Sequence, residues 1–181
     1  MPTEYPHIKE PVNGEYPFEV LLLSGKPLQT KRLGRFVIDL ETLTWHKDSL
    51  IVDYNHDEKQ ILGFTDDFNL TDEGLVVRGK LISDEFVDRL VQLSASGTPF
   101  EASPTISEQE GEAIFVSENE TAVVNGVQHQ GPLTIFKYVP LRGMGICPYG
   151  TDRFTHFTVL KERFETMKNQ HEKRTLMSVA P

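Results

Sequence analysis

The chain has 181 residues, of which 38% are apolar and 25% are charged, and its net charge is −9. This length supports one domain with a hydrophobic core, and the composition is that of a globular protein. The negative charge argues against nucleic acid and anionic membranes as partners, since both bind basic patches. We expect no membrane span, because no apolar stretch approaches about 20 residues, and no secretion signal, because no basic segment followed by an apolar one opens the chain.

Cysteine and histidine usage argues against a disulfide or a metal site. The single cysteine, Cys147, excludes an internal disulfide, fits a reducing compartment and lies in an apolar run typical of a core. The six histidines lack the close spacing of metal ligands, and they occupy positions His7, His46, His56, His129, His156 and His171. We therefore expect no metal and no cofactor.

The first half of the chain predicts strands followed by one helix. Residues 1–15 are rich in Pro, Glu and Asn and predict an extended arm. Short apolar or alternating runs predict strands over 18–23, 35–40, 50–54, 61–66 and 75–82. Residues 83–97 predict a helix, because Ser83 or Asp84 can cap its start, an apolar stripe follows, and Gly97 can end it.

The second half predicts further short strands, over 98–106, 113–116, 121–124, 132–138 and 141–147, with a mobile-tipped hairpin over 111–131. Residues 159–173 have a helical pattern, and the tail beyond them has none. The strands are too closely spaced for repeated βαβ units. We therefore predict an α+β, β-rich fold: an N-terminal arm (1–15), a closed or nearly closed, mostly antiparallel β-barrel domain (16–158) with flanking helices, and a C-terminal helix with a frayed tail (159–181).

One strand ends in an unusual way. The apolar run at 51–54 stops at Asn55-His56-Asp57, which places an imidazole between polar residues at the rim of a sheet. His56 is either part of an ordinary polar turn or a general base for a nucleophile elsewhere, since the free imidazole pKa of about 6.5 suits both acid and base chemistry.

A candidate nucleophile follows the central helix. In the stretch FEASPTI (100–106), Ser103 shares a strand face with Thr105 and lies opposite Ala102 and Pro104. A serine on a strand is usually a small, half-buried residue. A serine hydroxyl becomes a useful nucleophile when a base such as histidine lies within about 2.6–3.2 Å.

Four motifs in order resemble the prohead (procapsid) maturation proteases of tailed bacteriophages, which are related in fold to the herpesvirus assemblin proteases. They are DYNHDEKQILG (53–63), GLVVRGKL (74–81), GTPFEAS (97–103) and LRGMGICPYGTD (141–152). Together they cover about residues 18–158, and each motif alone is weak.

The resemblance implies that His56 and Ser103 form the catalytic pair of a serine endopeptidase. It implies that the substrates are the major capsid protein, the scaffold protein and the protease itself, cleaved inside the assembling procapsid in the bacterial cytoplasm. The herpesvirus relatives are active as dimers, so self-association is a further implication, with neither nucleic acid nor membrane as a partner.

Two departures from the family pattern affect the site. Gly143 occupies the position of the family's acid, which would orient the histidine, and the candidates to replace it are His129, Asp57, Glu58 and Glu101. The other departure is Pro104, which has no N–H with which to form an oxyanion hole after Ser103.

Arg142, in the segment LRGMG, is the candidate oxyanion donor, and its alternative role is a surface salt bridge. The leading hypothesis is a serine endopeptidase of procapsid maturation. The alternatives are a catalytically impaired relative that serves as a structural module in capsid assembly, or an unrelated β-barrel binding protein.

Overall fold

The computed structural model describes residues 11 and 13–160. The described elements, in chain order, are β1 (Glu15–Leu23), β2 (Leu28–Thr30), β3 (Gly34–Ile38), the 3-10 helix η1 (Leu40–Thr42), β4 (Ile51–Tyr54), β5 (Asp57–Thr71), β6 (Gly74–Ile82), α1 (Glu85–Ala95), β7 (Glu101–Ile106), β8 (Glu112–Val116), β9 (Thr121–Val124), β10 (Val127–Gln130), β11 (Leu133–Lys137), β12 (Leu141–Cys147) and β13 (His156–Val159). Neither of the helices in this described part has the length and apolar content to cross a membrane.

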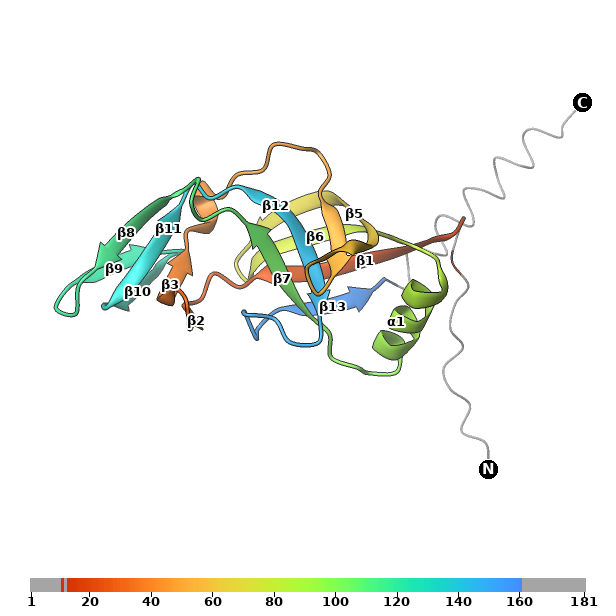
Figure 1. The fold of residues 1–181 in the computed structure, drawn as a ribbon. Coiled ribbons are helices and arrows are strands. Elements are labelled where there is room, and N and C mark those ends of the chain that lie inside the picture. Colours follow the sequence, from red (N-terminus) through yellow and green to blue (C-terminus); the bar gives the residue numbers. More distant parts are fainter. Residues whose placement is uncertain (1–10, 12, 161–181) are drawn as a thin grey trace, which may run out of the picture.

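Seven strands form one curled sheet in the order β13-β1-β6-β5-β4-β12-β7 (Figure 1). Every neighbouring pair is antiparallel except β4 and β12, which run parallel. The predicted β-rich, mostly antiparallel fold is therefore confirmed.

The sheet is a curled half-barrel, which corrects the prediction of a closed or nearly closed barrel. Between the two edges of the sheet, the N–H of Phe157 in β13 donates to the carbonyl of Phe100, just before β7, at 3.2 Å. Farther along β7, the Thr155 hydroxyl accepts from the N–H of Ala102 at 2.9 Å and donates to its carbonyl at 3.0 Å. A side chain thus occupies the place that a neighbouring strand would need for closure.

The core lies inside this sheet and follows from the alternation of its strands. In β6, for example, Val77, Gly79 and Leu81 are buried while Arg78 and Lys80 are partly exposed, as the sequence predicts. The largest fully buried side chains of the sheet include Phe18, Leu22, Leu62, Leu81, Met144 and Ile146. Each such side chain stabilises the fold by about 1.5–3 kcal/mol through removal of apolar surface from water.

A second, smaller unit of strands was not predicted. Strands β2, β3, β11 and β8 form a four-stranded sheet, and β9 and β10 form a hairpin beside it, far from α1 (Figure 1). This unit has its own apolar cluster, made of Val37, Val116, Val124, Leu133 and Ile135. The 111–131 segment is therefore divided, because β8 pairs with β11 while β9 pairs with β10.

The helix predicted over 83–97 is confirmed as α1. Asp84 caps it by accepting the N–H of Val87 at 2.7 Å, and Gly97 follows it with a φ of +97°. The second flanking helix was predicted to begin at Val159, which instead ends strand β13. The remainder of that predicted helix, like most of the predicted N-terminal arm, lies outside the described residues.

Candidate active site

Three neighbouring strands place the candidate residues on one face of the main sheet. Across β4, β12 and β7, Asp53, Gly145 and Ser103 form one row of partners. Ile51, Gly143 and Thr105 form the next row. Residues in these rows share a face because side chains alternate along each strand. The face is the outer one, since the Ile51 side chain is 53% exposed whereas that of Val52 is fully buried.

His56 lies in the two-residue turn that joins β4 to β5. Asn55 and His56 have φ values of 56° and 60°, and Tyr54 pairs with Asp57 across the turn. These are the features of a type I′ turn, in which both central residues adopt the left-handed conformation. The N–H of His56 donates to Oδ1 of Asp53 at 2.7 Å. This contact folds the turn back over the outer face.

The imidazole of His56 lies over Gly145 and reaches β7. Its Nδ1 is 3.1 Å from the hydroxyl oxygen of Thr105, within hydrogen-bonding distance. A Cβ at position 145 would lie only 3.3 Å from Cε1 of His56 and 3.0 Å from Oδ1 of Asp53. Glycine at 145 therefore leaves room for the ring between the turn and β7.

Ser103 lies on the same strand face as Thr105, one row closer to the turn that carries His56. It is 9% exposed, and no hydrogen bond of its side chain is found within residues 11 and 13–160. The structure thus brings His56 to the face that bears Ser103, and the direct partner of the imidazole is Thr105. The catalytic roles assigned to His56 and Ser103 remain predictions.

Two residues of this arrangement were missed by the sequence analysis. Asp53 is nearly buried, and burial raises the pKa of its carboxyl, an effect that the hydrogen bond from the His56 N–H opposes. Thr105 was noticed only as a neighbour of Ser103. The available signals were a lone acid inside the apolar run of β4 and a second hydroxyl two residues after the serine.

Two of the three acidic candidates to orient His56, Glu101 and Asp57, have other partners in the structure. Glu101 accepts the N–H of Gly150 at 2.5 Å, and Asp57 accepts the N–H of Lys59 at 2.9 Å. Glu58 is exposed on β5 directly after the turn. No group of three or more His, Cys, Asp or Glu side chains within the described residues is placed to hold a metal ion.

His129, the remaining candidate, lies in β10 of the smaller unit, far from β4 and β7 (Figure 1). Its side chain is 6% exposed, and its Nε2 is buried without a hydrogen-bond partner among the residues that the structure describes. The structure does not bring His129 together with His56.

Arg142, the candidate oxyanion donor, is exposed and forms an ion pair with Glu110. Its guanidinium is therefore engaged at the surface. Cys147 is buried as predicted, and burial raises its thiol pKa to about 11, which keeps it protonated near neutral pH.

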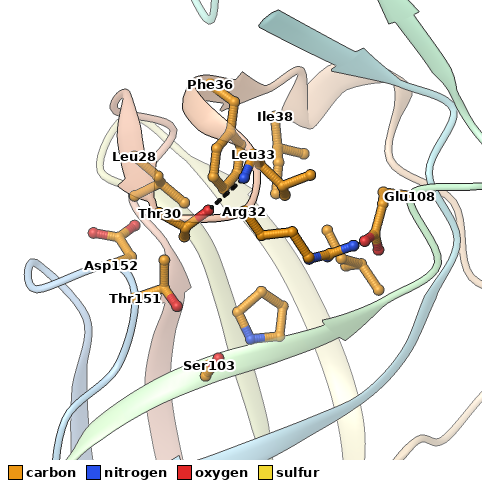
Figure 2. Close-up of a pocket in the computed structure, with 12 residues that line it drawn as sticks. Leu28, Thr30, Arg32, Leu33, Phe36, Ile38, Ser103, Glu108, Thr151 and Asp152 are labelled. Carbon is orange, nitrogen blue, oxygen red and sulfur yellow. Dashed lines mark hydrogen bonds and ion pairs between the residues drawn. The ribbon is translucent and has the colours of Figure 1, made fainter.

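A pocket borders Ser103 where β7 faces the β2–β3 hairpin (Figure 2). Ser103, Pro104 and Ile106 line one side, whereas Thr105 is not among the lining residues. Ser103 is thus among the residues that line the cavity, whereas Thr105, whose hydroxyl contacts the imidazole, is not.

Comparison with known proteins found one structural similarity. No family model matches the chain, and no curated protein matches it. Among solved structures, it is similar to the Kaposi's sarcoma-associated herpesvirus protease, in a room-temperature crystal structure with an allosteric inhibitor. The identity is 14%, the TM-score is 0.41, and 92% of each chain is covered. At this TM-score the similarity carries no argument about function.

Proposed function

We propose that this protein is a serine-type endopeptidase in which His56 activates Ser103. The observation that carries the proposal is the placement of an imidazole over the strand face that bears Ser103, a small residue whose side chain has no hydrogen bond in the described part of the chain. The left-handed backbone of His56 supports it, since strained residues persist mainly where a fold retains them for function.

Thr105 has a positioning role in this proposal. When its hydroxyl oxygen accepts the Nδ1–H of His56, the neutral ring carries its lone pair on Nε2. A base needs that free nitrogen to remove a proton from serine. A threonine hydroxyl has no charge, so it stabilises the imidazolium less than a carboxylate does. The nearby Asp53 carboxylate adds negative charge, and we expect a slow enzyme.

The reaction begins when the Ser103 oxygen attacks the carbonyl carbon of a peptide bond and its proton passes to Nε2 of His56. The resulting imidazolium gives this proton to the leaving amine as the C–N bond breaks, which leaves an acyl-enzyme. Water then attacks the ester with His56 again as base, and the ester bond breaks to release the acid and restore Ser103.

Ser103 is a better nucleophile candidate than Thr105 for two reasons. It lines the pocket, and Thr105 does not. The Thr105 hydroxyl is also engaged with Nδ1, and its β-branched carbon hinders attack.

We further propose that the substrates are capsid and scaffold proteins, and the chain itself, during procapsid maturation in the bacterial cytoplasm. Support comes from the four ordered motifs that resemble the phage prohead proteases. The second candidate function is a non-catalytic assembly module, which Gly143 favours because it replaces the family's acid.

Co-expression with the neighbouring major capsid and scaffold genes tests the proposal. We expect shortened capsid or scaffold protein with the wild type and full-length protein with Ser103→Ala. Equal processing by both forms would exclude Ser103 as the nucleophile. Intact substrates that assemble only when the chain is present would favour the non-catalytic module.

A further inference from the structure

A second cavity lies between the main sheet and the smaller unit, away from the candidate active site. It measures about 1010 Å³, and none of its described lining residues belongs to β4, β7 or β12. The β5–β6 turn and the segment that leads into β13 line it from the main sheet, and η1 and the β9–β10 hairpin line it from the other side. Its volume is at the upper end of small-ligand sites, which are about 300–1,000 Å³.

Exposed apolar side chains gather in this cavity. Leu70 near the end of β5, Val127 in β10 and Phe154 before β13 all line it, and they are 50%, 55% and 45% exposed. Single exposed apolar side chains are common on protein surfaces, whereas several that line one cavity mark an interaction site.

Three carboxylates without a cationic partner line the same cavity. They belong to Glu41 of η1 and to Asp72 and Glu73 of the β5–β6 turn, and all three residues are exposed. No ion pair or hydrogen bond of these carboxylates is found within the described residues. Lys26, the one lysine among the described lining residues, holds its ammonium over the ring of Phe154, 3.7 Å from the ring centroid. The carboxylates therefore outnumber the ammonium, and the cavity attracts positive charge.

The wall also contains a polar group that the fold leaves unused. His129 lines the cavity and is 6% exposed, and its Nε2 is buried with no hydrogen-bond partner among the described residues. A buried polar atom without a partner is uncommon in a folded protein. A peptide that enters the cavity offers such partners through its backbone N–H and carbonyl groups.

We infer that this cavity docks a short segment of another protein in which Lys or Arg alternates with large apolar side chains. The cationic side chains pair with the three carboxylates, and the apolar side chains cover the three exposed apolar residues. A small cation would leave that apolar surface exposed to water. A second copy of this chain would bring a net charge of −9 to a surface that is already negative. This docking site goes beyond the proposed peptidase activity and does not depend on it, because neither His56 nor Ser103 lines the cavity.

Peptide binding to the full chain tests the inference. The probes are the capped peptide Gly-Leu-Lys-Phe-Arg-Gly, its anionic counterpart Gly-Leu-Glu-Phe-Asp-Gly and its polar counterpart Gly-Ser-Lys-Ser-Arg-Gly, at low salt and about pH 8, where free imidazole is neutral. We expect the first peptide to shift the methyl NMR signals of Leu70 and Val127 and the ring ¹⁵N signals of His129. It should bind at least about tenfold more tightly than either counterpart.

Two sets of substitutions that remove the same charge provide the control. The first set removes the carboxylates of the cavity, with Glu41→Gln, Asp72→Asn and Glu73→Gln. The second set changes exposed acids that do not line the cavity, with Asp48→Asn, Asp66→Asn and Glu118→Gln. We expect the first set to weaken binding of the cationic peptide by about tenfold, because each exposed ion pair contributes little alone and the three add. The second set should change it by less than about twofold, because salt screens distant charges.

Four results would overturn the inference. They are equal binding of the first peptide and either counterpart, equal effects of the two sets of substitutions, the same NMR shifts with spermidine alone, and the same shifts on concentrating the protein without peptide. The spermidine result would assign the cavity to small cations, and the concentration result would assign it to a second copy of the chain.

Discussion

Two of the strand-connecting turns in the described part of the chain are of the same kind and differ at one position. Asn55-His56 joins β4 to β5, and Asn125-Gly126 joins β9 to β10, all four residues with positive φ. Glycine adopts this conformation freely, whereas a residue with a side chain pays about 1–2 kcal/mol. The second turn has the residue that stability favours, and the first has a histidine that reaches Thr105.

This difference indicates which turn is shaped by stability and which by function. Asn125 anchors its turn to the body of the protein by donating to the carbonyls of Gly25 and Ile38, each at 2.9 Å, and by accepting the N–H of Leu40. The β4–β5 turn is anchored by Asp53, which accepts the backbone N–H of His56, so the His56 side chain is available to contact β7. The following predictions test this contrast, from the largest expected effect to the smallest.

Making the first turn resemble the second, with His56→Gly, is expected to lower peptidase activity by several powers of ten. Ser103→Ala should be similarly damaging, and the double variant hardly worse than either, because residues that act as one unit are strongly non-additive. The initial rates of cleavage by the three variants, measured on the substrate that the wild type processes, check this prediction. If the two losses multiply, His56 and Ser103 do not form one nucleophile–base pair.

Replacing Thr105 tests how the His56 ring is oriented. Thr105→Val keeps the shape and removes the acceptor for Nδ1, so we expect kcat to fall about 10–100-fold with little change in KM. Thr105→Ser should restore most of the rate. The ¹⁵N NMR shifts of His56 should report one tautomer in the wild type and a mixture in Thr105→Val; an unchanged tautomer would remove the positioning role.

Gly145→Ala tests the space beneath the ring. The added Cβ would lie 3.2–3.3 Å from the backbone nitrogen and Cε1 of His56, so the ring must shift by a few tenths of an ångström. We expect about a tenfold loss of activity. In Gly143→Ala the nearest atom is the Ile51 carbonyl oxygen at 3.0 Å, and Cβ and Oγ1 of Thr105 lie at an ordinary contact distance of 3.8 Å. Equal activity of the two variants would contradict a role for Gly145 in seating the imidazole.

Exchanging the turn residues should change stability by unequal amounts. Gly126→His places a side chain at a φ of +74° with open space around it, and is expected to cost about 1–2 kcal/mol of unfolding free energy without loss of activity. His56→Gly should change stability by less than about 1 kcal/mol, since relieved strain offsets a lost hydrogen bond and added chain entropy. Urea unfolding measures both. A Gly126→His protein as stable as the wild type would undermine the contrast.

The smallest expected effect concerns Asp53. Burial raises the pKa of its carboxyl in the folded state, so the folded protein binds this proton more tightly than the unfolded chain. The stability that this carboxyl contributes is therefore fully present at a pH below its pKa in the unfolded chain. It is lost as the pH rises through the pKa of the carboxyl in the folded protein. Asp53→Asn keeps an oxygen that accepts the His56 N–H, and it should remove this dependence of stability on pH. If the stability of the wild type and that of Asp53→Asn change in parallel with pH, the raised pKa of Asp53 is contradicted.

Alternation along single strands was enough to predict part of the site. It placed Ser103 and Thr105 on one face and identified the turn that carries His56. It also predicted the interior face of β6 and the extent of α1, because these depend on residues close together in the sequence.

The remainder depends on pairings between distant segments. The contact of Thr105 with His56 requires the register of β4, β12 and β7, which lie far apart along the chain. The smaller unit escaped prediction because β2 has only three residues and the parallel β3–β11 pair joins segments about 100 residues apart. At the edge of β7, the Thr155 hydroxyl bonds both the N–H and the carbonyl of Ala102, which lies 53 residues earlier in the chain.

The most direct test of His56 acting on Ser103 is covalent labelling with a fluorophosphonate, which reacts only with an activated serine. We predict that mass spectrometry finds the wild type labelled at Ser103, with Thr105 unmodified, and that labelling falls by at least about a hundredfold in His56→Gly. Gly126→His serves as the matched control and should be labelled at the wild-type rate. An unlabelled Ser103 in the folded wild type, or labelling that is undiminished in His56→Gly, would contradict the account.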